Sequence, residues 1–457
     1  MGVSLTHSQT RTDLGQTSIG RCDIIFGMET KLQTTPYKGT TDTYPQDMLV
    51  RNFMFNTWTS VAKRFGFEEY DTPLIEETAL YIAKSGDEIA STQLYNFTDK
   101  GGREIAIRPE MTPSLARMIA AKKNELTLPL KWFNIGKYYR YEKPQKGRRR
   151  EFVQLNVDIF GISTLEAELE TFQYILAVME EFKAPKETYE LRVNNRYLLN
   201  YLFEDILKLS DEKKAKVGRA IDNYTKLGKD AFIGYLRELE LNDKQVEQVL
   251  EFLKWTLDDL RKIAEKSEGA AQLIELFAKA EELGLTNIRF EPSIMRGLLY
   301  YTGTVIEMFD IGSKDNPRAL LGGGRYDDLL TIFGEEKLPA FGFAWGDIVL
   351  EDYLKTYNLI PETKTDTKVF LPLFDAKLYA YIQNVAKQLR EEGINTEAQM
   401  IAIKFGNQLK YASKKNIPWV MIIGEDEINA KKVQLKNMET GEQNLVALEE
   451  AIKIINS

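Results

Sequence analysis

Hydrophobic and polar residues alternate along the chain with two periods, one typical of α-helices and one typical of β-strands. Apolar side chains recur at helical spacing between residues 47 and 65, and Gly66 is placed to end that helix in the left-handed conformation. Hairpins around a central sheet with flanking helices indicate an α+β domain. The same patterns predict helices over 112–122 and 164–182 and strands over 67–73, 93–97, 104–107, 130–139 and 152–160.

Residue usage changes twice after this region, which indicates further domains. Residues 196–285 are rich in Lys, Glu, Leu and Asp, contain no Pro and follow a helical period, so we expect a helical insertion. From residue 368 onward strands alternate with helices, which is typical of an α/β domain. The expected divisions are an extension at 1–34, a first domain at 35–195 that resumes at 286–360, the insertion at 196–285, a linker at 361–367 and the α/β domain at 368–457.

Composition narrows the chemistry that the chain can perform. The 457 residues carry a net charge of −8, and the only cysteine and the only histidine, Cys22 and His7, precede every patterned segment. Zinc sites of Cys and His, catalytic triads and histidine acid–base catalysis are therefore excluded from the patterned body. A lone cysteine forms no intrachain disulfide, which fits a reducing compartment, and we expect a cytoplasmic protein.

Residues 1–34 form a polar segment rich in Ser, Thr, Gln and Gly. The segment lacks the positive start and long apolar core of a secretory signal, and its acidic residues fit a transit peptide poorly. We expect either a disordered tail or upstream sequence before a true start at Met28. No run of about 18 uncharged apolar residues is present, so we expect no transmembrane helix and no membrane partner.

A basic segment between two predicted strands carries the strongest chemical signal. Seven of the fourteen residues from 137 to 150 are Lys or Arg, in a chain whose net charge is negative. Such a run can be a solvated hairpin, but here Arg140 and Glu142 share one strand face, across from Arg148 and Phe152. Guanidinium groups bind phosphates and carboxylates, and an aromatic ring can stack on a base. The arrangement indicates a site for a nucleotide and a carboxylate.

The pattern Arg140-x-Glu142, a loop, then Arg148-x-x-x-Phe152 resembles motif 2 of the class II aminoacyl-tRNA synthetases. Residues 139–148 resemble the histidyl-tRNA synthetase family in particular, and the resemblance covers residues 36–457. The other similar segments are 67–73 with Pro73 (motif 1), 108–112 (amino-acid binding), 296–303 (the histidine motif), 322–327, 342–346 (motif 3), and 404–412 and 422–427 (the anticodon-binding domain).

This resemblance implies a fold and an activity. The fold would be an α+β class II catalytic domain, an antiparallel sheet flanked by helices, with a helical insertion and a C-terminal α/β anticodon-binding domain. The activity would be that of a histidine–tRNA ligase, which joins L-histidine and ATP as histidyl-adenylate and then transfers the histidyl group to the terminal adenosine of tRNA(His). Mg²⁺ would bridge the phosphates of ATP. The assembly would be a homodimer formed through the motif 1 region.

The resemblance also implies roles for individual residues. Arg140 and Arg296 would act on the reacting carboxylate and α-phosphate from opposite sides. Asp158 would accept a proton from one imidazole nitrogen, and Arg148 would reach the γ-phosphate. The expected ATP-binding residues are Arg140, Glu142, Arg148, Phe152 (adenine) and Arg325. The expected histidine-binding residues are Glu110, Thr112, Arg140, Gln154, Asp158, Arg296, Tyr300, Tyr301 and Tyr326.

Three positions depart from the family pattern. Val349 stands where motif 3 normally supplies an arginine to ATP, and valine cannot pair with phosphate. Either another basic group, Arg325, takes that role, or the use of ATP is impaired. Leu299 stands where the family often has Asp, at a position that we expect to lie behind the site. Asp158 is one methylene shorter than the Glu of many bacterial members, but it keeps the carboxylate.

Two other functions stay open at this point. The family includes catalytically silent relatives that act as regulatory subunits and would bind histidine or an ATP-using partner. The motif 2 residues and the C-terminal domain oppose that interpretation. A general nucleic-acid-binding module could use the basic hairpin and the lysines between 404 and 415. Preference for one tRNA over bulk RNA would exclude the general module.

Overall fold

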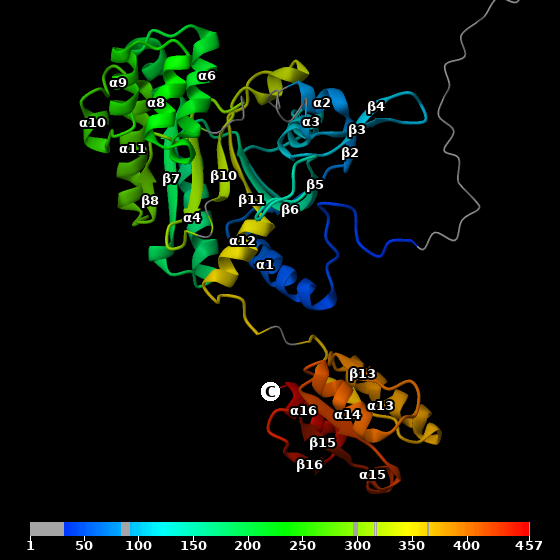
Figure 1. Cartoon of the computed structure of the whole chain (residues 1–457). Helices are drawn as coiled ribbons and strands as arrows, with labels where there is room; N and C mark the ends of the chain where they lie inside the picture. The colour runs from blue at the N-terminus through cyan, green and yellow to red at the C-terminus, as the bar shows by residue number, and fades with distance from the viewer. Residues whose placement is uncertain are drawn as a thin grey trace, which may run out of the picture. The chain divides into compact units, whose positions relative to one another are not determined.

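The computed structural model describes residues 32–83, 92–295, 300–314, 316, 318–362 and 365–456, without the side chains of residues 225 and 226. Most of the extension expected at 1–34 lies outside the described residues. Two β-sheets with separate hydrophobic cores organise this part of the chain (Figure 1). Every helix within the described ranges is too short or too polar to cross a lipid bilayer.

The larger sheet has eight strands in the order β1-β5-β6-β11-β10-β9-β7-β8. The pairs β1–β5 and β7–β8 are parallel, and the remaining pairs are antiparallel. The sheet is therefore mixed, with the predicted antiparallel order at its centre. Its strands are β1 (Glu68–Glu69), β5 (Leu130–Tyr139), β6 (Glu151–Phe160), β7 (Tyr189–Asn195), β8 (Ile288–Phe290), β9 (Thr304–Asp310), β10 (Ala319–Arg325) and β11 (Ala340–Gly346).

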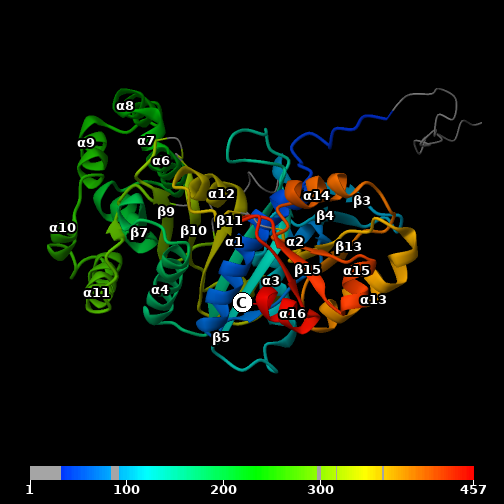
Figure 2. The ribbon, with the colours of Figure 1, turned by 90° about the horizontal axis from the view of Figure 1, so that it is seen from below.

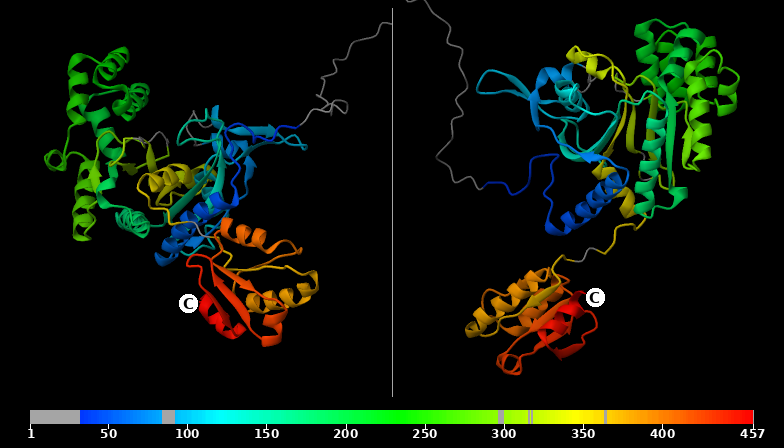
Figure 3. Two further views of the ribbon diagram at one scale, coloured as in Figure 1. Left: turned by 60° about the horizontal axis from the view of Figure 1, so that its bottom comes forward. Right: turned by 180° about the vertical axis from the view of Figure 1, so that it is seen from behind.

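Helices cover both faces of this sheet, and the two faces carry different cores. On one face α1 (Pro45–Arg64), α4 (Glu166–Glu181) and α12 (Asp347–Thr356) build the larger core (Figure 2 and Figure 3). Trp58 of α1 lies there with its ring 6.1 Å from that of Trp345 in β11. The other face carries a smaller, tyrosine-rich core beneath α3 (Thr112–Lys122) and the 3₁₀ turn η4 (Leu329–Phe333).

A small three-stranded sheet precedes the central hairpin. It has the order β2 (Ile75–Glu77), β4 (Glu104–Ile107), β3 (Tyr95–Thr98), and the short helix α2 (Thr78–Ile82) follows β2. The predicted β3–β4 hairpin is confirmed. Its turn is closed by the Asp99 carboxylate, which accepts the backbone N–H groups of Gly101 (2.8 Å) and Arg103 (2.9 Å).

Helices fill the region between β7 and β8. Two of its helices pack closely on each other, because a Cβ atom on Gly269 of α11 would lie 2.8 Å from the Cα of Leu198 in α5. Only a residue without a side chain permits that approach. The helices are α5 (Arg196–Asn200), the π turn η3 (Tyr201–Ile206), α6 (Asp211–Asp222), α7 (Tyr224–Leu227), α8 (Lys229–Glu238), α9 (Asp243–Phe252), α10 (Leu257–Arg261) and α11 (Glu268–Glu282).

The C-terminal residues form a five-stranded sheet with its own core. Strands β13, β12 and β14 are parallel, as the alternating pattern predicts, and the hairpin β15–β16 adds two antiparallel strands. The elements are β12 (Val369–Leu371), η5 (Ala376–Leu378), α13 (Tyr379–Glu391), β13 (Thr396–Ala398), α14 (Phe405–Lys414), β14 (Trp419–Ile422), α15 (Glu425–Ala430), β15 (Val433–Asn437), β16 (Gln443–Val446) and α16 (Leu448–Asn456).

Two strands of the larger sheet differ from the expectation. The strand expected over 67–73 pairs only at β1, because its last backbone hydrogen bond to β5 is that of the Tyr70 N–H, which donates to the Phe133 carbonyl oxygen (3.0 Å). Pro73 has no N–H with which to continue the ladder. The sequence patterns do not indicate β7, which follows α4 through the 3₁₀ turn η2 (Lys186–Thr188).

Candidate active site

The β5–β6 hairpin sets three of the expected site residues in one row. Its register pairs Tyr138 with Phe152, Gly136 with Gln154 and Trp132 with Asp158. Because successive side chains point to opposite faces of a strand, Phe152, Gln154 and Asp158 share the tyrosine-rich face. Phe152 and Asp158 are separated by roughly 20 Å along β6, at about 3.3 Å per residue. The row is long enough for an extended aminoacyl-nucleotide.

Arg140 stands at the Phe152 end of this row. Its backbone N–H donates to the Arg150 carbonyl oxygen (2.9 Å), and its Nε donates to the Pro109 carbonyl oxygen (2.9 Å). The guanidinium carbon lies 5.3 Å from the centre of the Phe152 ring. The structure thus brings together the cation expected at the α-phosphate and the ring expected to stack on adenine.

The motif 2 loop, residues 141–150, folds into a tight turn beside Arg140. Gln145 and Arg148 exchange both of their backbone hydrogen bonds (3.0 and 2.9 Å), and Gly147 between them has φ +71°. That left-handed conformation favours glycine. Glu142 is buried and forms an ion pair with Arg148. Its Oε1 atom has no hydrogen-bond partner among the described residues, although buried polar atoms normally have one, so this atom is available to bind a ligand.

A cluster of tyrosines surrounds Asp158 at the other end of the row. The Tyr326 hydroxyl donates to the Asp158 carboxylate, and the Tyr300 hydroxyl donates to the Glu110 carboxylate (3.2 Å). The Tyr326 ring lies 5.9 Å from that of Tyr300 and 6.5 Å from that of Tyr301. All five residues are buried. The cluster offers carboxylates and hydroxyls within an aromatic wall, which suits a small polar ring.

Burial controls the charge of Asp158. It raises the pKa of this carboxyl to about 7, while the hydrogen bond from Tyr326 acts in the lowering direction. Gly342 of β11 makes room for the group, because a Cβ atom there would overlap the Asp158 carboxylate. A carboxyl with this pKa changes its protonation state near neutral pH, so its ability to accept a hydrogen bond depends on pH.

The remaining expected histidine contacts lie around the start of α3. Thr112 is the first residue of that helix, and Glu110 precedes it. The Arg108 side chain fixes this segment, because it donates to the Asp71 carboxylate (2.8 Å) and to the Lys137 carbonyl oxygen (3.0 Å). Gln154, midway along the row, has an Oε1 atom without a partner among the described residues.

Tyr70 is a residue that the sequence analysis misses. It is buried, its hydroxyl has no partner among the described residues, and its ring lies 5.6 Å from that of Trp132, which is paired with Asp158. Burial raises the pKa of the Tyr70 hydroxyl, and the nearby Asp158 charge acts in the same direction. No local pattern distinguishes Tyr70 from an ordinary residue at the end of a strand.

The Arg325 side chain, which the sequence predicts to contact ATP, is engaged with partners inside the protein. The Arg325 guanidinium donates from Nε to the Glu168 carboxylate (2.8 Å) and from its two Nη atoms to the carbonyl oxygens of Ile162 (3.0 Å) and Thr164 (2.9 Å). A second ion pair with Glu168 and one with Asp327 occupy its remaining donors. The side chain of Glu168 is fully buried. Arg325 therefore joins β10 to α4 and the segment before it.

Replacing Arg325 with Met should lower the free energy of unfolding by about 3–5 kcal/mol, because it leaves the Glu168 charge buried and unpaired. Urea denaturation followed by circular dichroism measures the loss. The double variant Arg325→Met/Glu168→Leu removes both charges and should recover most of it. A variant Arg325→Met of unchanged stability with weakened ATP binding would restore the sequence-based assignment.

Arg296, the second expected catalytic arginine, lies outside the described residues, together with residues 297–299. Its position relative to Arg140 therefore stays a prediction. Leu299, the second departure from the family pattern, lies outside the described ranges in the same way.

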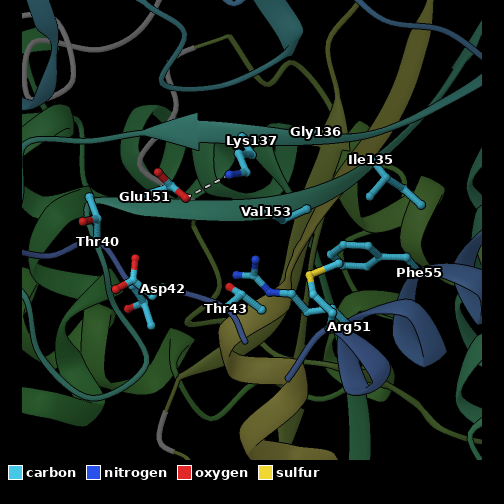
Figure 4. A pocket seen from close by; sticks show the side chains of 12 residues that line it. Thr40, Asp42, Thr43, Arg51, Phe55, Ile135, Gly136, Lys137, Glu151 and Val153 are labelled. Atoms are coloured by element: carbon cyan, nitrogen blue, oxygen red, sulfur yellow. Dashed lines mark hydrogen bonds and ion pairs between the residues drawn. The ribbon is translucent and has the colours of Figure 1, made fainter. Parts of the chain in front are cut away.

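A cavity of about 650 Å³ lies on the opposite face of the hairpin (Figure 4). Arg51 and Phe55 of α1 line it together with Lys137, Glu151 and Val153 of the two strands, and Lys137 pairs with Glu151 (3.2 Å). These strand residues alternate with those of the row, so their side chains leave the sheet on the other side. The cavity is therefore distinct from the candidate active site.

Comparisons with known proteins identify the family to which the chain is similar. A family model described as histidyl-tRNA synthetase matches residues 39–346, and one described as anticodon binding domain matches residues 363–457. A histidine--tRNA ligase from Leptospira biflexa serovar Patoc is 42% identical and covers 93% of this chain and 98% of its own. The chloroplastic/mitochondrial histidine--tRNA ligase of Arabidopsis thaliana is 37% identical over 92% of this chain and 86% of its own. The solved histidyl-tRNA synthetase of Nostoc sp. PCC 7120 covers 93% of this chain and 99% of its own, with 25% identity and a TM-score of 0.80.

Proposed function

Because the chain belongs to the histidyl-tRNA synthetase family, we propose that the row along β6 carries out the reaction of a histidine–tRNA ligase. The protein is a class II aminoacyl-tRNA synthetase that uses ATP to activate L-histidine and transfers the histidyl group to tRNA(His). One observation carries the assignment of the site. A cation over an aromatic ring, Arg140 over Phe152, shares a strand face with a buried carboxylate in a tyrosine cluster, Asp158.

Activation requires two anions to approach one another. A carboxylate oxygen of histidine forms a bond to the α-phosphorus of ATP, and the bond from that phosphorus to the bridging oxygen breaks as pyrophosphate leaves. Phe152 holds the adenine by stacking, and Arg140 draws the carboxylate and the α-phosphate together. Its charge opposes the negative charge that grows on the phosphate oxygens in the transition state. Arg296 acts on the same phosphate from the other side.

Selection of histidine depends on the tyrosine cluster. Asp158 accepts the N–H of the imidazole, while the hydrogen bond from Tyr326 keeps the carboxylate in place. Tyr300 and Tyr301 enclose the ring, and Glu110, Thr112 and Gln154 hold the α-amino group. A buried site built on hydrogen bonds discriminates strongly, because an amino acid that lacks the matching groups leaves polar atoms unpaired. In the second step a hydroxyl of the terminal adenosine attacks the histidyl carbonyl carbon, and AMP leaves.

Mg²⁺ accompanies ATP in this proposal. A hard cation prefers carboxylate oxygens, and Glu142 offers a buried Oε1 atom without a partner among the described residues. The residues present therefore fit the ion at the phosphate end of the row. When bound, it would neutralise part of the charge on the phosphates.

Further features support the assembly and the domain roles. Leu74 and Ile75, beside the motif 1 proline, are large apolar side chains that are 42% and 46% exposed, which supports a homodimer through this region. The match of residues 363–457 supports tRNA recognition by the C-terminal sheet. The domain divisions predicted from the sequence and a cytoplasmic location complete the proposal.

ATP–pyrophosphate exchange measured with each of the twenty amino acids in turn tests this function. We expect exchange with histidine alone, because only its side chain satisfies the buried carboxylate and hydroxyls. Histidine binding without exchange would support the regulatory-subunit alternative instead. The match to an anticodon binding domain already weighs against that alternative.

A further inference from the structure

Arg318 lies against the motif 2 loop, which already carries Arg148. Arg318 directly precedes β10, and its side chain passes Gly147: a Cβ atom built there would lie 3.0 Å from the Arg318 Cδ and 3.4 Å from its Nε. The same atom would lie 3.7 Å from a methyl group of Val349 on α12. Three segments that are distant in sequence therefore meet at the tip of the loop.

Within the part of the chain that the structure describes, Arg318 has no partner of opposite charge. Arg318 is partly buried and makes no hydrogen bond or ion pair with the described residues. The charged groups that act on it are Arg148 and Glu142, and Glu142 already pairs with Arg148. Burial lowers the pKa of Arg318, and the neighbouring Arg148 lowers it further. Among the described residues, two guanidinium groups thus lie near one carboxylate, and that carboxylate pairs with Arg148 and not with Arg318.

Hydrogen bonds to Asp310 hold described residues that precede Arg318 in the sequence. The Asp310 carboxylate accepts the backbone N–H groups of Gly312 (3.1 Å) and Ser313 (3.0 Å) and the side-chain amide of Asn316 (2.8 Å). Tyr357 of α12 donates its hydroxyl to the same carboxylate (2.7 Å). Arg318 follows Asn316 by two residues in the sequence.

We propose that Arg318 binds the terminal phosphates of ATP together with Arg148. This inference rests on the proposed function, because it takes the motif 2 hairpin as the ATP site. A polyanion is the ligand that two adjacent guanidinium groups favour, since each can donate two parallel hydrogen bonds to phosphate. Arg318 then supplies, from β10, the cation that Val349 does not supply from α12. Arg325 does not fill this role, because its guanidinium is paired with Glu168.

The test compares Arg318→Ala with the wild-type enzyme in histidine-dependent ATP–pyrophosphate exchange. We expect the KM for ATP to rise about 10- to 100-fold, as for the loss of a charge-assisted hydrogen bond to a ligand, while the KM for histidine stays unchanged. Binding of a non-hydrolysable histidyl-adenylate analogue should also stay unchanged, because it has no terminal phosphates. Arg318→Lys should fall between the two enzymes, since it keeps the charge and loses the fork.

Two further variants sharpen the comparison. Arg289→Ala removes an arginine that pairs with Glu190 and Glu291 at the far edge of the sheet, and it should leave the KM for ATP unchanged. Adding Val349→Arg to Arg318→Ala should recover part of the ATP affinity, because both positions adjoin Gly147. A double variant that binds ATP no better than Arg318→Ala would contradict the claim that position 318 replaces position 349.

Other outcomes overturn the inference outright. An Arg318→Ala enzyme with a wild-type KM for ATP excludes contact with the phosphates. If that enzyme instead loses affinity only for tRNA, the arginine belongs to an RNA contact. Equal weakening of ATP and of the adenylate analogue would mean that the site as a whole is disturbed. Wild-type protein without histidine-dependent exchange would refute the proposed function itself, before any variant is compared.

Discussion

An Arg140→Ala enzyme should lose histidine-dependent ATP–pyrophosphate exchange by a factor of about 10² to 10³. The Arg140 guanidinium lies over the Phe152 ring, which the proposal assigns to the adenine of ATP. Charge on the α-phosphate grows only in the transition state, so the loss should appear mainly in kcat and less in the KM for ATP. Steady-state exchange at varied ATP and histidine concentrations separates the two parameters.

Two control variants accompany Arg140→Ala: one keeps the positive charge at position 140, and the other removes an arginine elsewhere in the protein. Arg140→Lys keeps a positive charge without the planar fork and should recover only part of the rate. Arg289→Ala changes an arginine outside the site and should exchange like the wild type. Because the Arg140 Nε also donates to the Pro109 carbonyl oxygen, thermal unfolding must show that the variant is folded. A folded Arg140→Ala enzyme with a normal kcat would remove this residue from the mechanism.

An Asp158→Asn enzyme should bind histidine about 10²-fold more weakly. Tyr326 already donates to one oxygen of the carboxylate, and in the variant an NH₂ group can stand where the second oxygen was. The imidazole N–H would then face a donor instead of an acceptor, inside a buried site where an unpaired polar group is costly. The KM for histidine in the exchange assay measures the effect, and the KM for ATP should change little.

The dependence on pH provides an independent check on Asp158. Its pKa is raised to about 7, so the carboxyl is protonated below that pH and accepts the imidazole N–H poorly. Histidine affinity should therefore fall as the pH falls from 8 to 6. In Asp158→Asn only the titration of free histidine, with a pKa of about 6.5, should remain.

Asp158→Glu provides the matched control for this site. It keeps the carboxylate and should lose less affinity for histidine than Asp158→Asn does. An unchanged KM for histidine in Asp158→Asn, with a pH profile like that of the wild type, would rule out Asp158 as the imidazole acceptor.

Much of the fold can be read from local patterns. The helix predicted over 112–122 and the strand predicted over 130–139 are confirmed residue for residue, because apolar spacing within a short segment reports directly on its secondary structure. Gly66 has φ +74°, as expected of the residue that ends α1. Strand β7 and the hairpin β15–β16 are not indicated, because their pairing depends on strands elsewhere in the chain.

The residues of the candidate site also fall into two groups, those predictable from local sequence and those that depend on distant parts of the chain. Arg140, Glu142, Arg148 and Phe152 lie within thirteen consecutive residues, so their arrangement follows from one hairpin. Arg325 and Arg318 illustrate the opposite case. Arg325 is the last residue of β10 and Arg318 precedes the strand. Only their distant partners, Glu168 for Arg325 and the turn at Gly147 for Arg318, distinguish a structural arginine from a candidate phosphate ligand.

The amino-acid sequence by itself determined the family, the strands of the central hairpin and the residue types proposed to bind ATP, because each of these depends on short stretches of contiguous residues. The tertiary structure alone decided the lack of a partner for Arg318 among the described residues, the ion pair of Arg325 with Glu168 and the raised pKa of Asp158. These properties arise from burial and from contacts across more than 150 residues, such as the one between Tyr326 and Asp158. Electrostatic free energies depend on distances in space, and spacing along the chain does not encode those distances.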